Sequence, residues 1–161
     1  MVVIRSYLPG QDEAALRRLF VQLQDHEHDL VAWAPTGEQI ADDYLRFMHD
    51  RVALHDGLLL MAEEDGQVVG FACVLRRVER EEPDDPESDH AYLAEISVSP
   101  ERRGHGVGSA LLDAAERAAA ERGARTIRLV VVAANDGAQR VYSRRGYERS
   151  HVVMTKRLLR G

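Results

Sequence analysis

A glycine-rich turn between an apolar strand and a helix carries the clearest chemical signal in the sequence. Residues 103–108 contain three glycines, at 104, 106 and 108, and they follow an apolar segment at residues 91–98. Because glycine has no Cβ, backbone N–H groups in such a turn can converge on an anion, and the first N–H groups of the following helix can join them. The segment therefore predicts a phosphate-binding turn.

Two common phosphate-binding motifs fit this turn poorly. A P-loop is excluded because no Lys-Ser/Thr pair follows the last glycine. A dinucleotide fingerprint is nearly complete in Gly104, Gly106 and Ser109, but it requires an acidic residue after the next strand. The strand expected over residues 126–133 leads instead into Ala-Ala-Asn. A nucleotide-binding oxidoreductase domain is therefore disfavoured, also because the chain is short.

A third motif fits the turn better. Residues 103–108 match the pattern Q/R-x-x-G-x-G/A and so resemble the coenzyme A pyrophosphate motif of the GNAT N-acetyltransferase superfamily. The superfamily's second block is matched, at the same spacing, by Asn135, Ala138, Tyr142 and the pair Gly146-Tyr147. With two blocks in order, the resemblance covers about residues 91–147.

The resemblance implies acetyl-CoA as the acyl donor and no metal. In this superfamily the pantetheine arm lies between two diverging strands, which implies backbone contacts from Ile96, Ser97 and Val98. The pyrophosphate would be bound by the turn and the start of the helix, namely Arg103, Gly104, His105, Gly106, Val107, Gly108 and Ser109. His105 and Val107 would contribute only their backbone.

The resemblance also implies a proton donor for the leaving thiolate. Tyr142 follows Asn135 by seven residues, where the superfamily has a tyrosine that points at the coenzyme sulfur. A phenol is protonated at neutral pH and can donate a proton. Asn135 is expected either to bond the pantetheine arm or to cap the short helix that contains Tyr142, and both hypotheses stay open.

Glu95 is the candidate base for the acceptor amine. It is the one acid within the strand at residues 91–98. Burial would raise its pKa towards a value that suits a general base, and it could reach the amine directly or through water. Alternatively, Glu95 anchors a buried polar network. The segment at residues 26–28, His-Glu-His, is a more distant source of a base.

No metal site is expected. His26 and His28 have neighbouring carboxylates, but side chains two residues apart on a helix do not share a face, and no third histidine is nearby. Cys73 is the only cysteine and lies in an apolar strand, which excludes a disulfide framework and a cysteine-based metal site. We expect Cys73 to be a small buried hydrophobic residue.

Hydrophobic periodicity predicts the elements that must position these groups. They are a strand at 2–8, helices at 11–25 and 36–55, a hairpin of strands at 57–63 and 67–77, the strand–turn–helix at 91–122, a strand at 126–133 and a helix at 136–145. The order β-α-α-β-β-β-α-β-α-β agrees with the resemblance. The resemblance implies an α/β fold whose mixed, mostly antiparallel sheet is splayed between strands four and five. We expect one domain spanning residues 1–161.

Composition narrows the functional class. The net charge of −6 and the lack of a basic face argue against a nucleic-acid partner. No secretory signal opens the chain and no apolar run approaches the length of a membrane span, so we expect a cytoplasmic protein without a membrane partner. Residues 79–89 carry seven acids and are expected to form a solvated loop.

The end of the chain departs from the superfamily pattern. Family members commonly have two strands here, whereas residues 147–158 contain no Gly, Pro or Asn to turn a hairpin. We expect one long strand or a tight break near residues 150–151. An uncovered edge of that length invites pairing with another chain. The segment therefore predicts a homodimer through the C-terminal strand.

Together these features predict an N-acetyltransferase that moves acetyl from acetyl-CoA to a primary amine. Direct attack is expected because the lone cysteine has no neighbouring base to make it a nucleophile. The alternative is a non-catalytic module that binds or senses acyl-CoA. The acceptor is a small-molecule or peptide amine whose identity the sequence leaves open, together with the length of the acyl chain.

Overall fold

The structure, a computed structural model, describes residues 1–158 and contains two compact units. The first unit is Met1–Val130, and the second begins at Val131. The first unit contains β1 (Val3–Ser6), α1 (Glu13–Leu30), α2 (Gly37–Leu54), β2 (Leu58–Glu64), β3 (Gln67–Glu79), β4 (Asp89–Val98), a 3-10 turn (Pro100–Arg102), α3 (Val107–Glu121) and β5 (Ile127–Arg128). The second contains α4 (Asp136–Arg144). The expectation of one domain stays a prediction.

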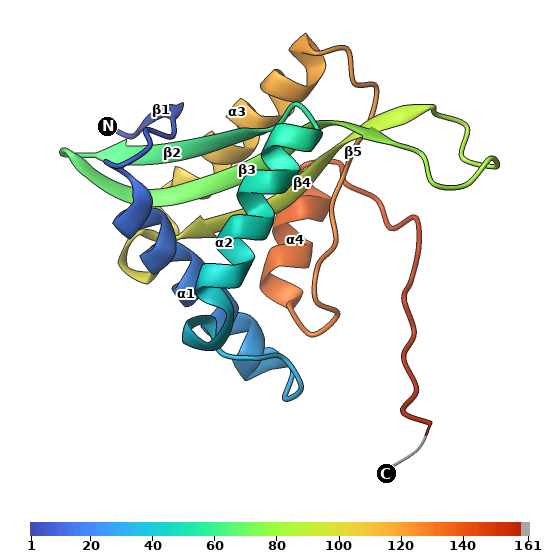
Figure 1. The fold of residues 1–161 in the computed structure, drawn as a ribbon, viewed down its shortest axis with the longest axis horizontal. Coiled ribbons are helices and arrows are strands. Elements are labelled where there is room, and N and C mark those ends of the chain that lie inside the picture. Colours follow the sequence, from blue (N-terminus) through green and yellow to red (C-terminus); the bar gives the residue numbers. More distant parts are fainter. Residues whose placement is uncertain (159–161) are drawn as a thin grey trace. The chain divides into compact units, whose positions relative to one another are not determined.

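The first unit is built on one mixed sheet with the strand order β1-β2-β3-β4-β5. Neighbouring strands are antiparallel except for β4 and β5, which are parallel. Helices α1 and α2 cover one face of the sheet and α3 covers the other (Figure 1). The predicted α/β class and the predicted order of elements are confirmed as far as α4.

The main core lies between the sheet and the layer formed by α1 and α2. Helix α1 contributes Leu19 and Phe20, α2 contributes Met48, and β3 contributes Phe71 and Leu75, all almost inaccessible to solvent. Their spacing is helical on the helices and alternating on the strand, which is the pattern that buries one face of each element. This packing fixes both helices against the strands that carry the candidate site.

The connection between α1 and α2 is fixed at both ends. Helix α1 continues to Leu30, beyond its expected end near residue 25. Helix α2 begins as predicted after Thr36, whose backbone N–H donates to Oε1 of Gln39 at 2.8 Å. The Asp25 carboxylate accepts the N–H of Gly37 at 2.7 Å and so joins the two helices.

The β2–β3 hairpin has the predicted turn. Asp65 and Gly66 have φ angles of 51° and 76°. Positive φ at both central residues is the type I′ geometry, which matches the twist of the flanking strands. The acidic loop at residues 80–88 then separates β3 from β4, and a salt bridge of 2.7 Å joins its Asp85 to Arg128 of β5.

Strands β4 and β5 diverge, as the resemblance implied. They pair only at Ala91 with Ile127 and at Tyr92 with Arg128, although β4 continues to Val98. Strand β5 is accordingly much shorter than the strand expected at residues 126–133. A strand ends where its neighbour no longer accepts its backbone hydrogen bonds. The apolar sequence after Arg128 was therefore not sufficient to extend β5.

The strand expected at residues 147–158 is not formed. These residues have no regular secondary structure, and no described residue after Arg128 joins the sheet. Val152, Val153 and Met154 are 75%, 87% and 90% exposed. The β-branched residues of this segment favour a strand although its alternation is mixed, but a strand also needs a partner for its backbone groups. Pairing of the segment with a second copy stays a prediction.

Candidate functional site

The predicted phosphate-binding turn connects β4 to α3. Gly104 and Gly106 have φ angles of 76° and 85°, a region that other residues rarely adopt. The first backbone hydrogen bond of α3 runs from Ala110 N–H to the Gly106 carbonyl at 3.0 Å. The N–H groups of Val107, Gly108 and Ser109 therefore have no acceptor within the helix, and they are available to an anion.

The conformation of the turn does not explain why residue 108 is a glycine. Backbone conformation accounts for Gly104 and Gly106, but Gly108 lies in the first turn of α3 without a positive φ. A Cβ at Gly108 would meet only Cγ2 of Val98, at 3.7 Å, which is an ordinary contact. Neither backbone strain nor packing therefore requires glycine at position 108, and glycine is unfavourable in a helix. A ligand that lies close to the backbone would account for the glycine.

Arg103 and His105 help to set the shape of the turn. Arg103 Nε donates to the carbonyl of Val98 at 3.2 Å, which joins the turn to the end of β4. His105 Nδ1 lies 2.9 Å from the carbonyl oxygen of Arg103. This contact is within the turn, so it agrees with a backbone rather than a chemical role for His105.

The last residues of β4 expose backbone groups on the side where β5 has diverged. Ser99 N–H donates to the Val69 carbonyl of β3 at 2.8 Å. Because antiparallel strands alternate the direction of their backbone groups, Ile96 and Val98 direct theirs away from β3. Ser97 differs, since its hydroxyl is buried and donates to the Leu19 carbonyl of α1 at 3.2 Å. An extended ligand could add to this open edge as another strand would.

Glu95 lies on the face of β4 that is covered by α1 and α2. Its Oε1 accepts a hydrogen bond from the Tyr44 hydroxyl of α2. Burial raises the pKa of Glu95 to about 7, and the negative charge of Glu27 acts in the same direction. The Tyr44 hydrogen bond and the positive charge of Arg51 oppose this rise in pKa. A carboxylate that titrates near neutrality can accept a proton and return it to solvent.

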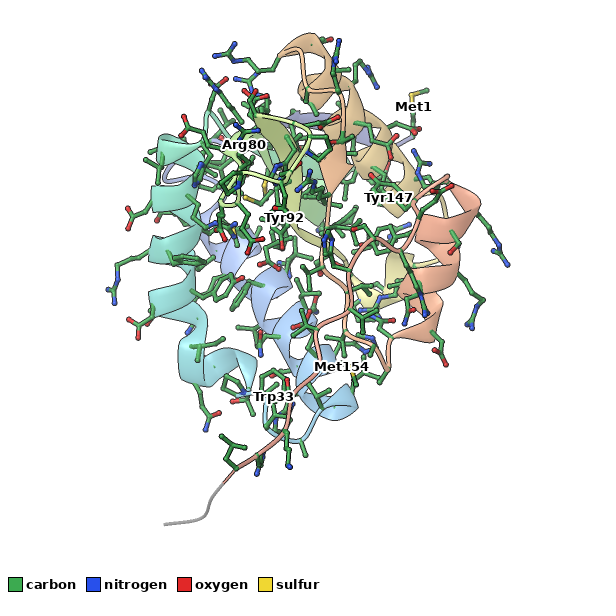
Figure 2. All side chains as sticks on the ribbon, turned by 90° about the vertical axis from the view of Figure 1, so that its right-hand side faces the viewer. Met1, Trp33, Arg80, Tyr92, Tyr147 and Met154 are labelled. Carbon is green, nitrogen blue, oxygen red and sulfur yellow. The ribbon has the colours of Figure 1, made fainter. Side chains whose placement is uncertain are left out.

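Aromatic side chains surround Glu95. Tyr44 stacks on Phe20 with ring centroids 4.6 Å apart. The Arg51 guanidinium lies over the rings of Phe47 and Tyr92, at 5.2 and 5.3 Å from their centroids. Figure 2 shows Tyr92 on the side of the sheet that faces α2. Tyr44 and Arg51, which both act on the Glu95 carboxylate, are therefore themselves packed against aromatic rings.

Sequence reasoning did not find Tyr44, Arg51 and Tyr92 as members of this cluster. Tyr44 has helical spacing with apolar residues of α2, which is typical of a ring that packs in the core. The phenol at a core-facing position was the available signal, because a buried hydroxyl normally needs a polar partner. Arg51 and Tyr92 carried no comparable signal, since each is ordinary on an exposed helix or a strand.

Asn135 and Tyr142 belong to the second unit. Asn135 Oδ1 accepts the N–H of Ala138 at 3.1 Å and so caps α4, one of its two predicted roles. The Tyr142 ring packs against Tyr147, with centroids 5.5 Å apart at an angle of 60°. Binding of the pantetheine arm by Asn135 and proton donation by Tyr142 both stay predictions.

Other candidates have structural explanations. His28 Nδ1 contacts the carbonyl oxygen of Ala34 in the α1–α2 connection. Trp33 lies in the same connection, and its side chain is 73% exposed (Figure 2). Within residues 1–158 no group of His, Cys, Asp and Glu side chains is arranged to bind a metal. Burial raises the pKa of Cys73 to about 12, so its thiol is not a nucleophile at neutral pH.

Comparison with known proteins identifies the family. Residues 14–147 match the acetyltransferase (GNAT) family. The chain belongs to this family. Its matched segment begins on α1 and ends at Tyr147, so it includes Glu95, the turn and Tyr142. The family resemblance stated from the two sequence blocks is confirmed.

Individual relatives agree with this assignment. The chain is 30% identical over 152 residues to a mycothiol acetyltransferase of Cellulomonas flavigena, an alignment that covers 94% of this chain and 42% of the relative. A putative acetyl transferase from Pyrococcus furiosus superposes with a TM-score of 0.75 at 22% identity, covering 98% and 100% of the two chains. An aminoglycoside N-acetyltransferase in complex with CoA superposes with a TM-score of 0.68 at 24% identity, and the alignment covers 98% of this chain and 99% of that structure.

The two kinds of similarity carry different weight. The chain spans less than half the length of the mycothiol acetyltransferases that it matches, whereas it covers nearly all of the superposed structures. Those structures support the GNAT fold of the chain and leave its acceptor undefined. In residues 1–158 no helix combines the length and apolar character of a membrane span.

Proposed function

We propose that the chain transfers an acetyl group from acetyl-CoA to a primary amine by direct attack, with Glu95 as the general base. The observation that carries this proposal is the arrangement on β4. One strand bears a carboxylate with a pKa of about 7, then an open backbone edge, and then a glycine-rich turn that fits a phosphate. These features match the three parts of the reaction: proton removal, thioester positioning and coenzyme binding.

The turn and the open edge of β4 would hold the donor. The N–H groups at the start of α3 have no helical acceptor of their own, and the helix dipole favours a pyrophosphate there. The pantetheine amides would bond the backbone of Ile96 and Val98 at the open edge. Such contacts fix the thioester along β4, and a backbone N–H can polarise its carbonyl.

Glu95 would act on the acceptor. The nitrogen of a neutral amine attacks the thioester carbonyl carbon, forming the C–N bond, and the C–S bond breaks when the tetrahedral intermediate collapses. Glu95 takes the proton that the nitrogen loses, and the departing sulfur needs a proton in turn. A carboxylate with a pKa of about 7 is half ionised at neutral pH, so it can accept that proton under ordinary conditions.

We assign protonation of the thiolate to Tyr142. It occupies the position that follows Asn135 by seven residues in the family's second block, on α4. Tyr142→Phe keeps the ring that packs on Tyr147 and removes only the hydroxyl. Turnover should fall by about a hundredfold with little change in acetyl-CoA affinity. Stopped-flow rates near those of the wild type would remove Tyr142 from the mechanism.

The acceptor is the part of the reaction that an experiment must supply. One relative is named for mycothiol and one superposed structure for aminoglycosides, and we propose that this chain also acts on an amine. The decisive test mixes the protein with acetyl-CoA and a panel of amines, and follows free thiol. Thiol release that requires both an amine and an intact Glu95 supports the proposal. Coenzyme binding without release across the panel indicates the alternative, an acyl-CoA binding module.

A further inference from the structure

Tyr44 presents its hydroxyl to Glu95 from a ring that cannot move freely. The ring stacks on Phe20 at 4.6 Å with an angle of 21° between the planes, and Phe47 packs on it edge-on at 5.6 Å. These two aromatic contacts restrict the movement of the Tyr44 side chain. The position of the hydroxyl relative to the carboxylate of Glu95 is therefore set by the core of the first unit.

The hydroxyl keeps its proton in this environment and can therefore donate to Glu95. Burial, and then the negative charge of Glu95, raise the pKa of Tyr44 far above its ordinary value, so the phenol stays protonated. Packing alone does not explain a tyrosine here, since phenylalanine would fill the same space without a buried hydroxyl. The hydrogen bond to Glu95 is what the hydroxyl adds.

The groups that face Glu95 come from each element around it. Glu27 approaches from α1, Tyr44 and Arg51 from α2, and Tyr92 from β4 itself. Cys73 is paired directly opposite Glu95 on β3, and burial keeps its thiol protonated with a pKa of about 12. Of these groups only Tyr44 has a hydrogen bond to the carboxylate.

We propose that Tyr44 is a positioning residue for acetyl transfer: its hydroxyl occupies one oxygen of the Glu95 carboxylate and leaves the other to take the proton of the acceptor amine. This inference rests on the proposed function of Glu95. A carboxylate with one oxygen fixed has one orientation for the remaining lone pairs. The same hydrogen bond favours the ionised form, so it keeps a larger fraction of Glu95 ready to accept a proton.

Tyr44→Phe tests the inference through the pH dependence of kcat/KM. Without the donor the pKa of Glu95 should rise, because the ionised form loses its hydrogen bond. The acid limb of the profile should move up by about one pH unit, with activity at low pH about tenfold lower and most of it regained at alkaline pH. The KM for acetyl-CoA should not change, since the coenzyme turn is untouched.

Tyr7→Phe is the matched control. Tyr7 also packs against the core and also carries a pKa raised by burial, but its ring lies against His49 and has no contact with Glu95. Removal of the Tyr7 hydroxyl should leave the acid limb of the pH profile in place.

Variants of the charged residues near Glu95 provide a second test. Arg51→Gln should shift the limb in the same direction as Tyr44→Phe, and Glu27→Gln in the opposite direction.

Two measurements separate failure of this inference from failure of the proposed function. If Glu95→Gln leaves the acid limb unchanged, Glu95 is not the base and both proposals fail. If Glu95→Gln removes the limb but Tyr44→Phe leaves it in place, only the role of Tyr44 is wrong. A titration of the Glu95 carboxyl by ¹³C NMR in the folded Tyr44→Phe protein gives the same answer without activity. An unchanged midpoint there would overturn the inference.

Discussion

The environment of Glu95 favours its neutral form, and this gives Glu95→Gln an expected effect on stability. The carboxyl has an ordinary pKa of 4.5 and a pKa of about 7 in the folded chain. The folded state therefore binds more protons than the unfolded state between these values, and stability falls as the pH rises through this range. The gap corresponds to about 3 kcal/mol of stability that is present below pH 4.5 and lost above pH 7.

Glutamine has no charge to bury, so Glu95→Gln should avoid most of this loss. Its Oε1 can still accept the Tyr44 hydrogen bond, while its amide group fits the second oxygen position less well, which we take to cost about 1 kcal/mol. The variant should be about 1 kcal/mol less stable than the wild type below pH 4.5 and should exceed it by about 2 kcal/mol at about pH 8.5. For a chain of this size that is about 4 to 8 °C in Tm.

Urea unfolding of the two proteins, followed by circular dichroism across this pH range, measures the difference directly. Glu38→Gln is the control, because the Arg17 hydrogen bond lowers the pKa of Glu38. Its contribution is present above the ordinary pKa of a glutamate and is lost as the pH falls, so Glu38→Gln should destabilise near neutrality and have no effect in acid. If Glu95→Gln is no more stable at alkaline pH, or if its effect does not vary with pH, burial of an ionisable Glu95 is refuted.

Two further predictions concern the turn and the C-terminal segment. Gly108→Ala should keep or raise the Tm, because alanine is a better helix former and its methyl meets only Val98, yet it should weaken acetyl-CoA binding by about tenfold in calorimetry. Unchanged affinity would show that no ligand occupies the space beside Gly108. Residues 147–158 should join two copies of the chain, so sedimentation equilibrium at tens of micromolar should show a dimer, and a monomer alone would contradict this.

Local signals in the sequence were enough for much of the fold. Asp65-Gly66 specified its hairpin because few residue pairs tolerate positive φ at both positions. The predicted end of the helix at residue 122 agrees with Gly123, which follows α3 with a φ of 93°. The turn at residues 103–108 was predicted in the same way, since its glycines are close together in the sequence and the positive φ of Gly104 and Gly106 is a local property of the backbone.

Contacts between distant residues could not be predicted in this way. The hydrogen bond from Tyr44 to Glu95 spans 51 residues. It depends on the packing of α2 against the sheet, which no local pattern specifies. The predicted length of β5 was wrong for a similar reason. Residues 126–133 have strand propensity, but pairing ends at Arg128 because β4 and β5 diverge.

A bulge in β4 explains why Glu95 faces the helices at all. Tyr92 lies on the α1–α2 side, under Arg51, so strict alternation along the strand would put Glu95 on the opposite face. The register with β3 changes at this point: Val74 pairs with Leu93 and Cys73 with Glu95, so one residue of β4 has no counterpart. The extra residue restores Glu95 to the side of Tyr92.

The same bulge accounts for the open edge of the strand. It lies at Ala94, two residues after Tyr92, which is the last residue of β4 that pairs with β5. A bulge bends its strand and increases the local twist, so β4 turns away from a neighbour that continues straight. The single extra residue therefore has two consequences for the proposed reaction. It places Glu95 on the side of the sheet that faces α1 and α2, and it lies where β4 and β5 stop pairing, which leaves the backbone of Ile96 and Val98 open for the donor contacts that we propose.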